Sequence, residues 1–396
     1  GREEKSLDFV LLQIAVPRDN EIKIDAAEQM IASLYSVKSG GGFLGFLSSQ
    51  NHFTFEIAAL PENIRFYISC PANLQDLVEK QIHGAYPGAE VKEVDEYNIF
   101  SEEGKVAFTA LKLRKPAFYP IKVYKDLPTD PLSSVTSALA KMESGEGAAI
   151  QIIVSPANNK WRTAGKRFVS KAKEAELSAE GPRRVADART LEAIENKCSK
   201  AGFEVTIRIV TTAETREAAK IHLDNIKGAF EQFSSDWNGF KSHKTRFKNS
   251  FMTDFIYRFQ PIFGPKSILN AEELATIFHL PNKTVETPHI FWLNAKRAPA
   301  PAQIATEGLY LGRSVYRGIE KPIFQAEDDR RRHTYIIGRT GTGKTELLKL
   351  MAMQDIKAGR GVAFVDPHGD AAEDILTQIP ASRAEDVIYF DPADYE

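Results

Sequence analysis

Short apolar runs alternate with helical repeats of apolar residues through the first hundred positions of the chain. Apolar runs bounded by turn residues predict strands, and apolar side chains at a spacing of three to four predict amphipathic helices. Strands are predicted at 7–17, 52–60, 64–70 and 89–94, and helices at 24–36 and 73–86. The resulting order β-α-β-β-α-β predicts a ferredoxin-like αβ domain over residues 1–100.

A second αβ pattern covers residues 101–260. Strands are predicted at 106–113, 120–125, 148–154 and 203–211, and helices at 130–142, 157–176, 187–200 and 213–233. This alternation predicts a mixed sheet with helices packed on it. The two αβ regions are compatible with a distant duplication, which the sequence does not establish.

A connector is predicted over residues 261–320. Asn270 is a candidate N-cap for a short helix at 271–280, with Glu273 three residues further on. The prolines that follow hold the chain extended. Short strands are then predicted at 308–317 and 321–325, and residues 321–396 form a separate nucleotide domain. The expected fold is therefore multidomain, with α/β and α+β parts.

The composition is that of an ordinary globular protein, with 43% hydrophobic and 26% charged residues. Lys and Arg number 51 and Asp and Glu 53, so net charge does not indicate a nucleic-acid partner, and any basic surface must be local. Cys70 and Cys198 lack metal-ligand spacing, which favours buried thiols in a reducing compartment. No apolar run approaches the roughly 18 residues that span a bilayer.

The segment Gly338–Thr345 reads GRTGTGKT and carries the clearest chemistry of the sequence. A short apolar strand at 334–337 precedes it and an amphipathic helix at 346–357 follows it, which is the setting of a phosphate-binding loop. Glycines let the loop fold around phosphate, and backbone N–H groups at the helix N-terminus point at the anion. The expected nucleotide contacts are Gly338, Arg339, Thr340, Gly341, Thr342, Gly343, Lys344 and Thr345.

Two of these side chains have distinct expected roles with ATP and Mg²⁺. Lys344 is placed to reach the β- and γ-phosphates, where it is a candidate catalytic residue, and Thr345 is placed to ligate Mg²⁺. A strand at 362–365, a helix at 371–379 and a strand at 387–390 follow. Such a β-α-β-α-β series predicts the first part of a RecA-like P-loop NTPase with a parallel sheet.

Asp366 ends the second of these predicted strands, at the sheet edge where ligands bind. It is a candidate catalytic residue that acts on the Mg²⁺ shell, the attacking water or a neighbouring subunit. An equally weighted alternative makes Asp366 or Asp370 a helix N-cap carboxylate. His368 is better explained as a turn residue with a local hydrogen bond.

The segments GRTGTGKT, VAFVDPHGD and DVIYFDPAD resemble the conjugative DNA-transfer ATPases of type IV secretion systems, which are TraG/TraD-like members of the HerA/FtsK superfamily. The stretch ILNAEELATIFHLP at 268–281 resembles the segment that precedes the motor core in those proteins. The resemblance is specific over about 268–396. It implies a homo-hexameric, ATP-driven pump on the cytoplasmic face of the cell membrane, moving single- or double-stranded DNA or secreted protein with other secretion-system components.

The resemblance also implies a Walker B strand, a polar sensor and an arginine finger, which the motor places after the DPHGD element. Asp391 follows an apolar strand pattern, but Pro392-Ala393-Asp394 is not the usual acidic continuation. We expect both ends of the sequence to be internal to a longer protein, and the resemblance implies contact with the membrane through segments outside this stretch. We therefore expect this stretch to bind ATP weakly without turning it over, and the whole protein to be an ATPase.

Several weaker signals remain open. The basic runs at 160–173 and 240–251 suit phosphate contact and base stacking, although solvated helix faces are more common. The glycine-rich loop at 39–48 suits a membrane or partner contact, or folds back on its own domain. Arg330-Arg331-Arg332 suits contact with nucleotide, DNA or a neighbouring protomer, or a solvated strand entry.

Three functions follow from these observations. The first is an ATP-driven DNA translocase or coupling ATPase. The second is a protein-secretion or assembly ATPase on the same motor fold. The third is a scaffold that holds nucleotide without hydrolysing it.

Overall fold

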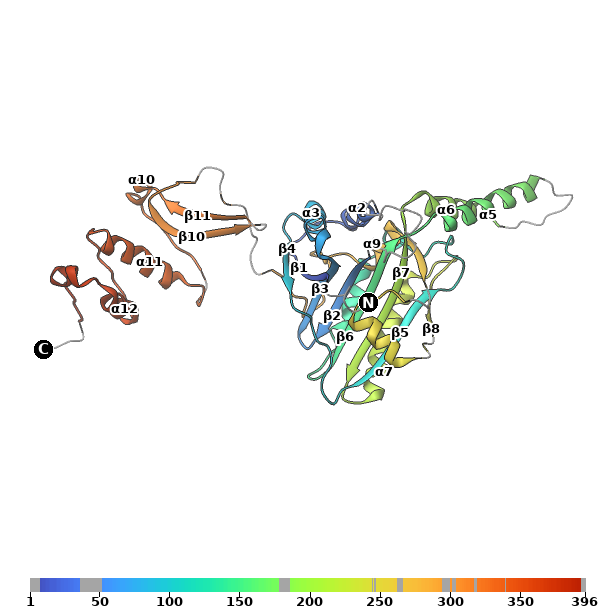
Figure 1. Cartoon of the computed structure of the whole chain (residues 1–396), viewed down its shortest axis with the longest axis horizontal. Coiled ribbons are helices and arrows are strands. Elements are labelled where there is room, and N and C mark those ends of the chain that lie inside the picture. The colour runs from blue at the N-terminus through green and yellow to red at the C-terminus, as the bar shows by residue number, and fades with distance from the viewer. Residues whose placement is uncertain are drawn as a thin grey trace. The chain divides into compact units, whose positions relative to one another are not determined.

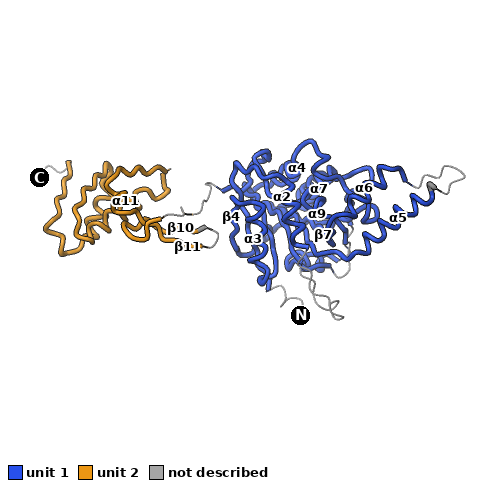
Figure 2. The backbone as a smooth tube through the Cα atoms, turned by 90° about the horizontal axis from the view of Figure 1, so that it is seen from above, with its two compact units in different colours: residues 1–296 blue, residues 297–396 orange. Residues whose placement is uncertain are grey.

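The computed structural model describes most of the chain, namely residues 8–35, 52–177, 186–243, 245, 247–261, 266–293, 300, 304–316, 319–338 and 340–392. The chain forms two compact units, residues 1–296 and 297–396 (Figure 2). This division differs from the predicted one in two ways. The boundary expected at residue 100 lies inside one continuous sheet, and the connector expected at 261–320 is shared between the units.

The described part of the first unit contains a nine-stranded sheet with the order β4-β1-β3-β2-β6-β7-β5-β8, and β9 pairs with β7 (Figure 1). Every strand pairing in it is antiparallel. The strands are β1 Phe9–Ala15, β2 Phe53–Leu60, β3 Asn63–Pro71, β4 Glu90–Val94, β5 Lys105–Leu113, β6 Gly147–Pro156, β7 Gly202–Ala213, β8 Phe240–His243 and β9 Ser267–Asn270. The helices are α2 Ile24–Leu34, α3 Gln75–Ala85, α4 Pro131–Leu139, α5 Lys160–Leu177, α6 Ala188–Ser199, α7 Arg216–Phe230, α8 Lys248–Ile256 and α9 Ala271–Ile277.

The sheet is built from two similar halves. Strands β1 to β4 with α2 and α3 follow the order β-α-β-β-α-β of a ferredoxin-like unit, and β5 to β8 with α4 and α7 follow it again. The sheet order of the second half is the reverse of the first, so the halves meet where β2 pairs with β6. At the middle of this seam, Glu56 lies opposite Gln151. This repeated topology supports the duplication that the sequence left open.

The halves differ at one connection. A tight turn at Pro61 and Glu62, with Glu62 at a φ of 56°, joins β2 to β3 in the first half. The equivalent connection in the second half, between β6 and β7, contains α5 and α6. These two helices extend beyond the end of the sheet (Figure 1). They pack on a small cluster of their own around Trp161, Val169, Leu191 and Ile194.

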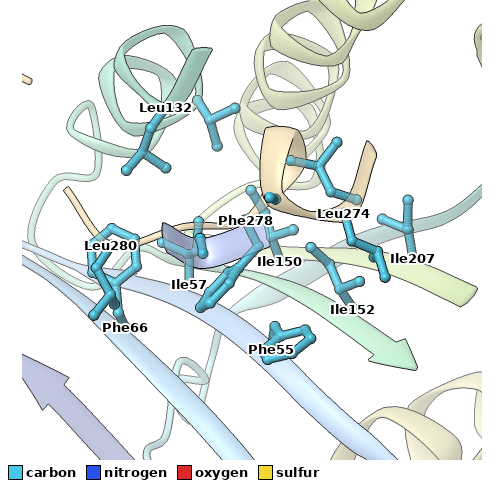
Figure 3. Close-up of a cluster of buried hydrophobic side chains, with 14 of the residues drawn as sticks. Phe55, Ile57, Phe66, Leu132, Ile150, Ile152, Ile207, Leu274, Phe278 and Leu280 are labelled. Atoms are coloured by element: carbon cyan, nitrogen blue, oxygen red, sulfur yellow. The ribbon is translucent and has the colours of Figure 1, made fainter. Parts of the chain in front are cut away.

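One face of the sheet carries the main core, under helices α2, α3, α4, α7 and α9. Helix α9 lies over the seam between the halves, and none of its residues is exposed. Leu274 of α9 and Phe278, the residue after this helix, project toward Phe55, Phe66 and the isoleucines of the central strands (Figure 3). The rings of Phe278 and Phe55 stack at 4.9 Å. The halves therefore share one core, which explains why they do not separate into two domains.

The N-terminus of α9 is held by a capping box. The Asn270 side chain accepts from the Glu273 backbone N–H, and the Glu273 carboxylate accepts from the Asn270 N–H, as predicted. Glu273 also accepts from the Ile121 N–H and forms a buried ion pair of 3.0 Å with Lys197 of α6. Burial raises the pKa of Glu273 and lowers the pKa of Lys197. The carboxylate thus ties α9 to α6 and to the loop after β5.

The predicted strand at 120–125 is wrong, because its backbone groups bond elsewhere. Only a 3₁₀ turn, Tyr124–Asp126, forms there. The Ile121 N–H donates to Glu273, the Lys122 N–H to the Phe233 carbonyl and the Tyr124 N–H to the Thr276 hydroxyl. The pattern also did not predict β8, α8 or β9, which are short and depend on pairing or packing with distant segments.

The opposite face of the sheet has a buried polar centre beneath α8. Glu56 accepts hydrogen bonds from Tyr97, Gln151 and Arg258, whose guanidinium also pairs with Glu96. Apolar side chains, including Phe251 and Phe255 of α8, surround this network. A buried carboxylate is tolerated here because its oxygens are bonded to cationic and neutral donors.

The second unit begins with the hairpin of β10 Leu309–Tyr316 and β11 Ile319–Gln325, followed by α10 Glu327–Arg330, α11 Lys344–Lys357 and α12 Asp370–Gln378. The predicted strands at 334–337, 362–365 and 387–390 form no ladder within the described residues. Ile337, Val365 and Ile388 are 80%, 92% and 94% exposed. Strands of a parallel sheet are buried on both faces, and these segments lack such cover. The parallel RecA-like sheet therefore stays a prediction.

Across the residues that the structure describes, no helix has the length and apolarity needed to cross a bilayer.

Replacing Lys197 with Met should destabilise the first unit by about 3–5 kcal/mol, because it leaves the Glu273 carboxylate buried without its partner. Since burial raises the pKa of Glu273, the folded variant binds a proton more tightly than the unfolded chain. The difference in free energy of unfolding between the variant and the wild type should therefore become smaller as the pH falls from 8 toward 5. Urea unfolding followed by tryptophan fluorescence measures this, since all three tryptophans lie in the first unit.

Two controls make this test specific. Lys173→Met removes an exposed ion pair with Glu195 and should cost less than about 1 kcal/mol. Adding Glu273→Gln to Lys197→Met should recover part of the loss. A deficit that does not change with pH, and that the second substitution leaves untouched, would contradict the buried-pair explanation.

Candidate functional site

The loop at 338–345 leads directly into the N-terminus of α11. Lys344 and Thr345 are the first two residues of this 14-residue helix, and the N-cap position is Gly343. The first intrahelical bond runs from the Leu347 N–H to the Gly343 carbonyl. Because a glycine N-cap has no side-chain acceptor, the first-turn N–H groups are left for an external anion.

Three glycines give the loop its shape. Gly341 and Gly343 have φ values of 79° and 87°, in the left-handed region that other residues rarely adopt. A Cβ at Gly338 would lie 2.5 Å from the Thr342 hydroxyl, so no larger residue fits there without movement. The GxxxxGKT spacing therefore corresponds to a real conformational requirement. Arg339, one of the predicted contacts, lies outside the described residues.

The Lys344 side chain folds back over the loop. Its Nζ donates to the Gly338 carbonyl at 2.7 Å, so the ammonium and the first-turn N–H groups lie at the same end of α11. Lys344 is half-buried, whereas Thr340, Thr342 and Thr345 are exposed. This arrangement concentrates positive charge and N–H donors on an accessible loop, as a polyphosphate requires.

Helix α11 is fixed to the hairpin and to α10 along its length. The Gln354 amide donates to the Tyr310 carbonyl at 2.8 Å and accepts from the Tyr310 N–H at 3.0 Å. It therefore satisfies the hydrogen bonding of both backbone polar groups of this β10 residue. Asp355 pairs with Arg330, and Arg360 donates to both oxygens of Glu327. The first arginine of the run 330–332 thus has a structural role, while Arg331 and Arg332 are exposed.

Helices α11 and α12 run in the same direction. Lys349 in the first half of α11 pairs with Asp374 at the middle of α12 at 2.8 Å. Further along both segments, Arg383, which follows α12, donates to the carbonyl of Ile356 near the end of α11 at 2.9 Å. The loop at 338–345 and the N-terminus of α12 therefore lie at the same end of this helix pair, as the predicted β-α-β-α-β order requires.

Asp366 stabilises the N-terminus of α12. Its carboxylate accepts from the His368 N–H at 3.1 Å and from the Ala371 N–H at 2.9 Å. These backbone hydrogen bonds lower the pKa of Asp366, and the bond from the His368 N–H has the largest effect. The structure thus has the capping arrangement, with Asp366 and not Asp370 as the acceptor. A catalytic role for Asp366 stays a prediction, since no described contact joins it to the loop.

The other sequence signals have different outcomes. The glycine-rich loop at 39–48 lies outside the described residues. The basic run at 240–251 is divided between β8 and α8, where Phe240 and Phe251 are buried and Phe247 is 74% exposed. The basic run at 160–173 forms α5, and some of its cations line a groove with Phe118. Sequence alone gave no signal for Phe118, because it lies about fifty positions from its partners.

No group of three or more His, Cys, Asp and Glu side chains that could hold a metal ion occurs among the described residues.

Comparisons with known proteins give a family but no activity. A family model described as "Domain of unknown function (DUF8128)" matches residues 8–293. No curated protein matches the chain. Among solved structures, the chain is similar to "Crystal Structure of Aclacinomycin Oxidoreductase", with 12% identity over 57% of this chain and 41% of that one. The TM-score of 0.27 is too low for this likeness to support any argument.

Replacing Asp366 with Ala should fray the first turn of α12, because it removes the acceptor of the His368 and Ala371 N–H groups. Amide hydrogen exchange over 368–372 should become faster, while exchange in α11 stays unchanged. Asp370→Ala is the matched control, since Asp370 makes no side-chain cap. Unchanged exchange together with lost nucleotide binding in Asp366→Ala would instead favour the catalytic interpretation.

Proposed function

We propose that this chain, which belongs to the DUF8128 family, is an ATP- and Mg²⁺-binding motor subunit. The proposed activity is that of an ATP-driven DNA translocase or coupling ATPase of a conjugative or type IV secretion system. The observation that carries the proposal is the GRTGTGKT loop, which ends at Lys344 and Thr345 in the first turn of α11. The family match covers residues 8–293 and thus lies outside this loop.

The chemistry of the loop supports nucleotide binding. The glycine conformations at 341 and 343 leave room for phosphate, and the N-terminus of α11 supplies N–H donors. Lys344 would contact the β- and γ-phosphates, and Thr345 would hold Mg²⁺ together with phosphate oxygens and water. The metal would neutralise charge on the phosphates. Mg²⁺ in such sites takes many of its ligands from phosphate oxygens. The proposal therefore does not require a group of three or more metal-binding side chains, and none occurs among the described residues.

The transport role rests on the resemblance of the sequence to TraG/TraD-like motors, and its further consequences are part of the proposal. They are a homo-hexamer, a place at the cytoplasmic face of the membrane, and DNA as cargo. The shared direction of α11 and α12 supports this reading, because it matches the strand–helix order of a P-loop core. A protein-secretion ATPase and a non-hydrolysing scaffold are the outcomes that the experiments must separate.

Lys344→Ala should weaken binding of a fluorescent ATP analogue about ten- to hundredfold, because it removes a charge-assisted contact to phosphate. Lys357→Ala is the matched control, since it removes an exposed lysine from the other end of the same helix. Thr345→Ala should reduce the part of the affinity that depends on Mg²⁺. Equal binding by wild type and Lys344→Ala would overturn the nucleotide-binding proposal.

Cargo and turnover are tested separately. In a preparation that hydrolyses ATP, DNA should raise the ATPase rate if the protein is a DNA translocase. A rate that neither single- nor double-stranded DNA changes would favour the protein-secretion ATPase. Tight ATP binding with no hydrolysis in the assembled protein would favour the scaffold.

A further inference from the structure

Helices α5 and α6, inserted between β6 and β7, form an arm that is joined to the sheet by specific contacts. The Ala157 N–H donates to the Gly202 carbonyl where the insertion leaves and rejoins the sheet. The Trp161 ring lies so close to Gly202 that no side chain fits at that position. Because the equivalent connection of the first half is a tight turn, the arm is an addition to the repeated fold and is not needed to complete the sheet.

One face of α5 lines a groove of about 590 Å³. The α5 residues in it recur at helical spacing, and Phe118 from the loop after β5 completes the wall. The lining residues are Phe118, Lys160, Thr163, Ala164, Arg167, Phe168 and Lys171. Lys160 and Lys171 lie about 16 Å apart along the helix axis. The groove is therefore an elongated track with cations spread along it.

No acidic side chain among the described residues neutralises the cations of the groove. Lys160, Arg167 and Lys171 are exposed, and none of them forms an ion pair with a described residue. On other faces of the same helix, Lys173 pairs with Glu195 and Arg162 donates to the Lys200 carbonyl, whereas Lys166 is exposed and forms no ion pair with a described residue. Charge complementarity thus calls for an anionic occupant of the groove.

Two of the residues that line the groove, Phe118 and Phe168, are aromatic. The rings of Phe118 and Phe168 stack at 5.3 Å with an interplanar angle of 30°, and both side chains are only half-buried. Tyr119 packs against both rings and has Lys115 over its face at 6.0 Å. The Phe118 and Phe168 rings line a concave surface, which suits the stacking of flat groups and does not suit insertion into a bilayer.

We propose that this groove binds single-stranded nucleic acid, with backbone phosphates on Lys160, Arg167 and Lys171 and an unpaired base against the exposed part of Phe168. A track of unpaired cations beside an aromatic surface is the combination that non-specific single-strand binding uses. Paired bases of a duplex cannot reach such a surface, which favours single strands. The inference deepens the DNA-handling part of the proposed function, but it rests on α5 and is independent of the nucleotide loop.

The test measures fluorescence anisotropy of a labelled oligo-dT of about 20 nucleotides with the whole chain. Arg167→Gln/Lys171→Gln should bind at least about tenfold more weakly near 100 mM salt. The slope of log affinity against log salt should fall in size by about 1.4, which is about 0.7 for each lost phosphate contact. Phe168→Leu, which keeps an apolar side chain, should weaken binding about tenfold without changing the slope.

The matched control is Arg216→Gln/Lys220→Gln, which changes the same residue types at the same spacing on the exposed face of α7. Its affinity and slope should equal those of the wild type. The proposal is overturned by an equal loss in this control, by an unchanged slope in Arg167→Gln/Lys171→Gln, or by wild-type binding to phosphatidylglycerol vesicles in place of the oligonucleotide. Lys344→Ala should keep full oligonucleotide binding, so failure of the nucleotide site and failure of the groove give different results.

Discussion

The packing of α9 over the seam between the two halves of the sheet is the constraint on which the first unit depends. Both halves contribute to its surroundings, with Phe55 from one and Ile207 from the other (Figure 3). A helix buried on all sides needs its polar groups satisfied, and the pairing of Glu273 with Asn270 and Lys197 does this. Helix α9 therefore completes the core that both halves share.

The polar centre on the opposite face controls how the halves join. Glu56 and Gln151 face each other across the seam, and Arg208 of the next strand donates to Gln151. A slip of one residue between β2 and β6 would turn Glu56 toward the apolar core under α9. The buried hydrogen bonds with Arg258 thus favour one register over its neighbours, beyond what apolar packing alone would select.

The two proposed binding surfaces lie on elements that these cores leave accessible. The nucleotide loop precedes α11, which Gln354 and Asp355 anchor along its far half. The groove on α5 belongs to an insertion with its own small apolar cluster. In both cases a helix fixed by packing carries the basic side chains of the proposed site. Such preorganisation lowers the entropy cost of binding an anion.

Local signals in the sequence determined much of this protein. Apolar periodicity predicted most of the helices and most of the strands of the two halves. The Asn270–Glu273 capping box and the loop at 338–345 follow from short-range hydrogen bonding and glycine conformation. Only the tertiary structure decided the joining of the halves at β2 and β6 and the meeting of Phe118 with Phe168. Both depend on contacts between segments that are distant in the sequence. A local pattern of apolar and polar side chains predicts a helix or a strand, but it does not predict which distant segment will pack against it.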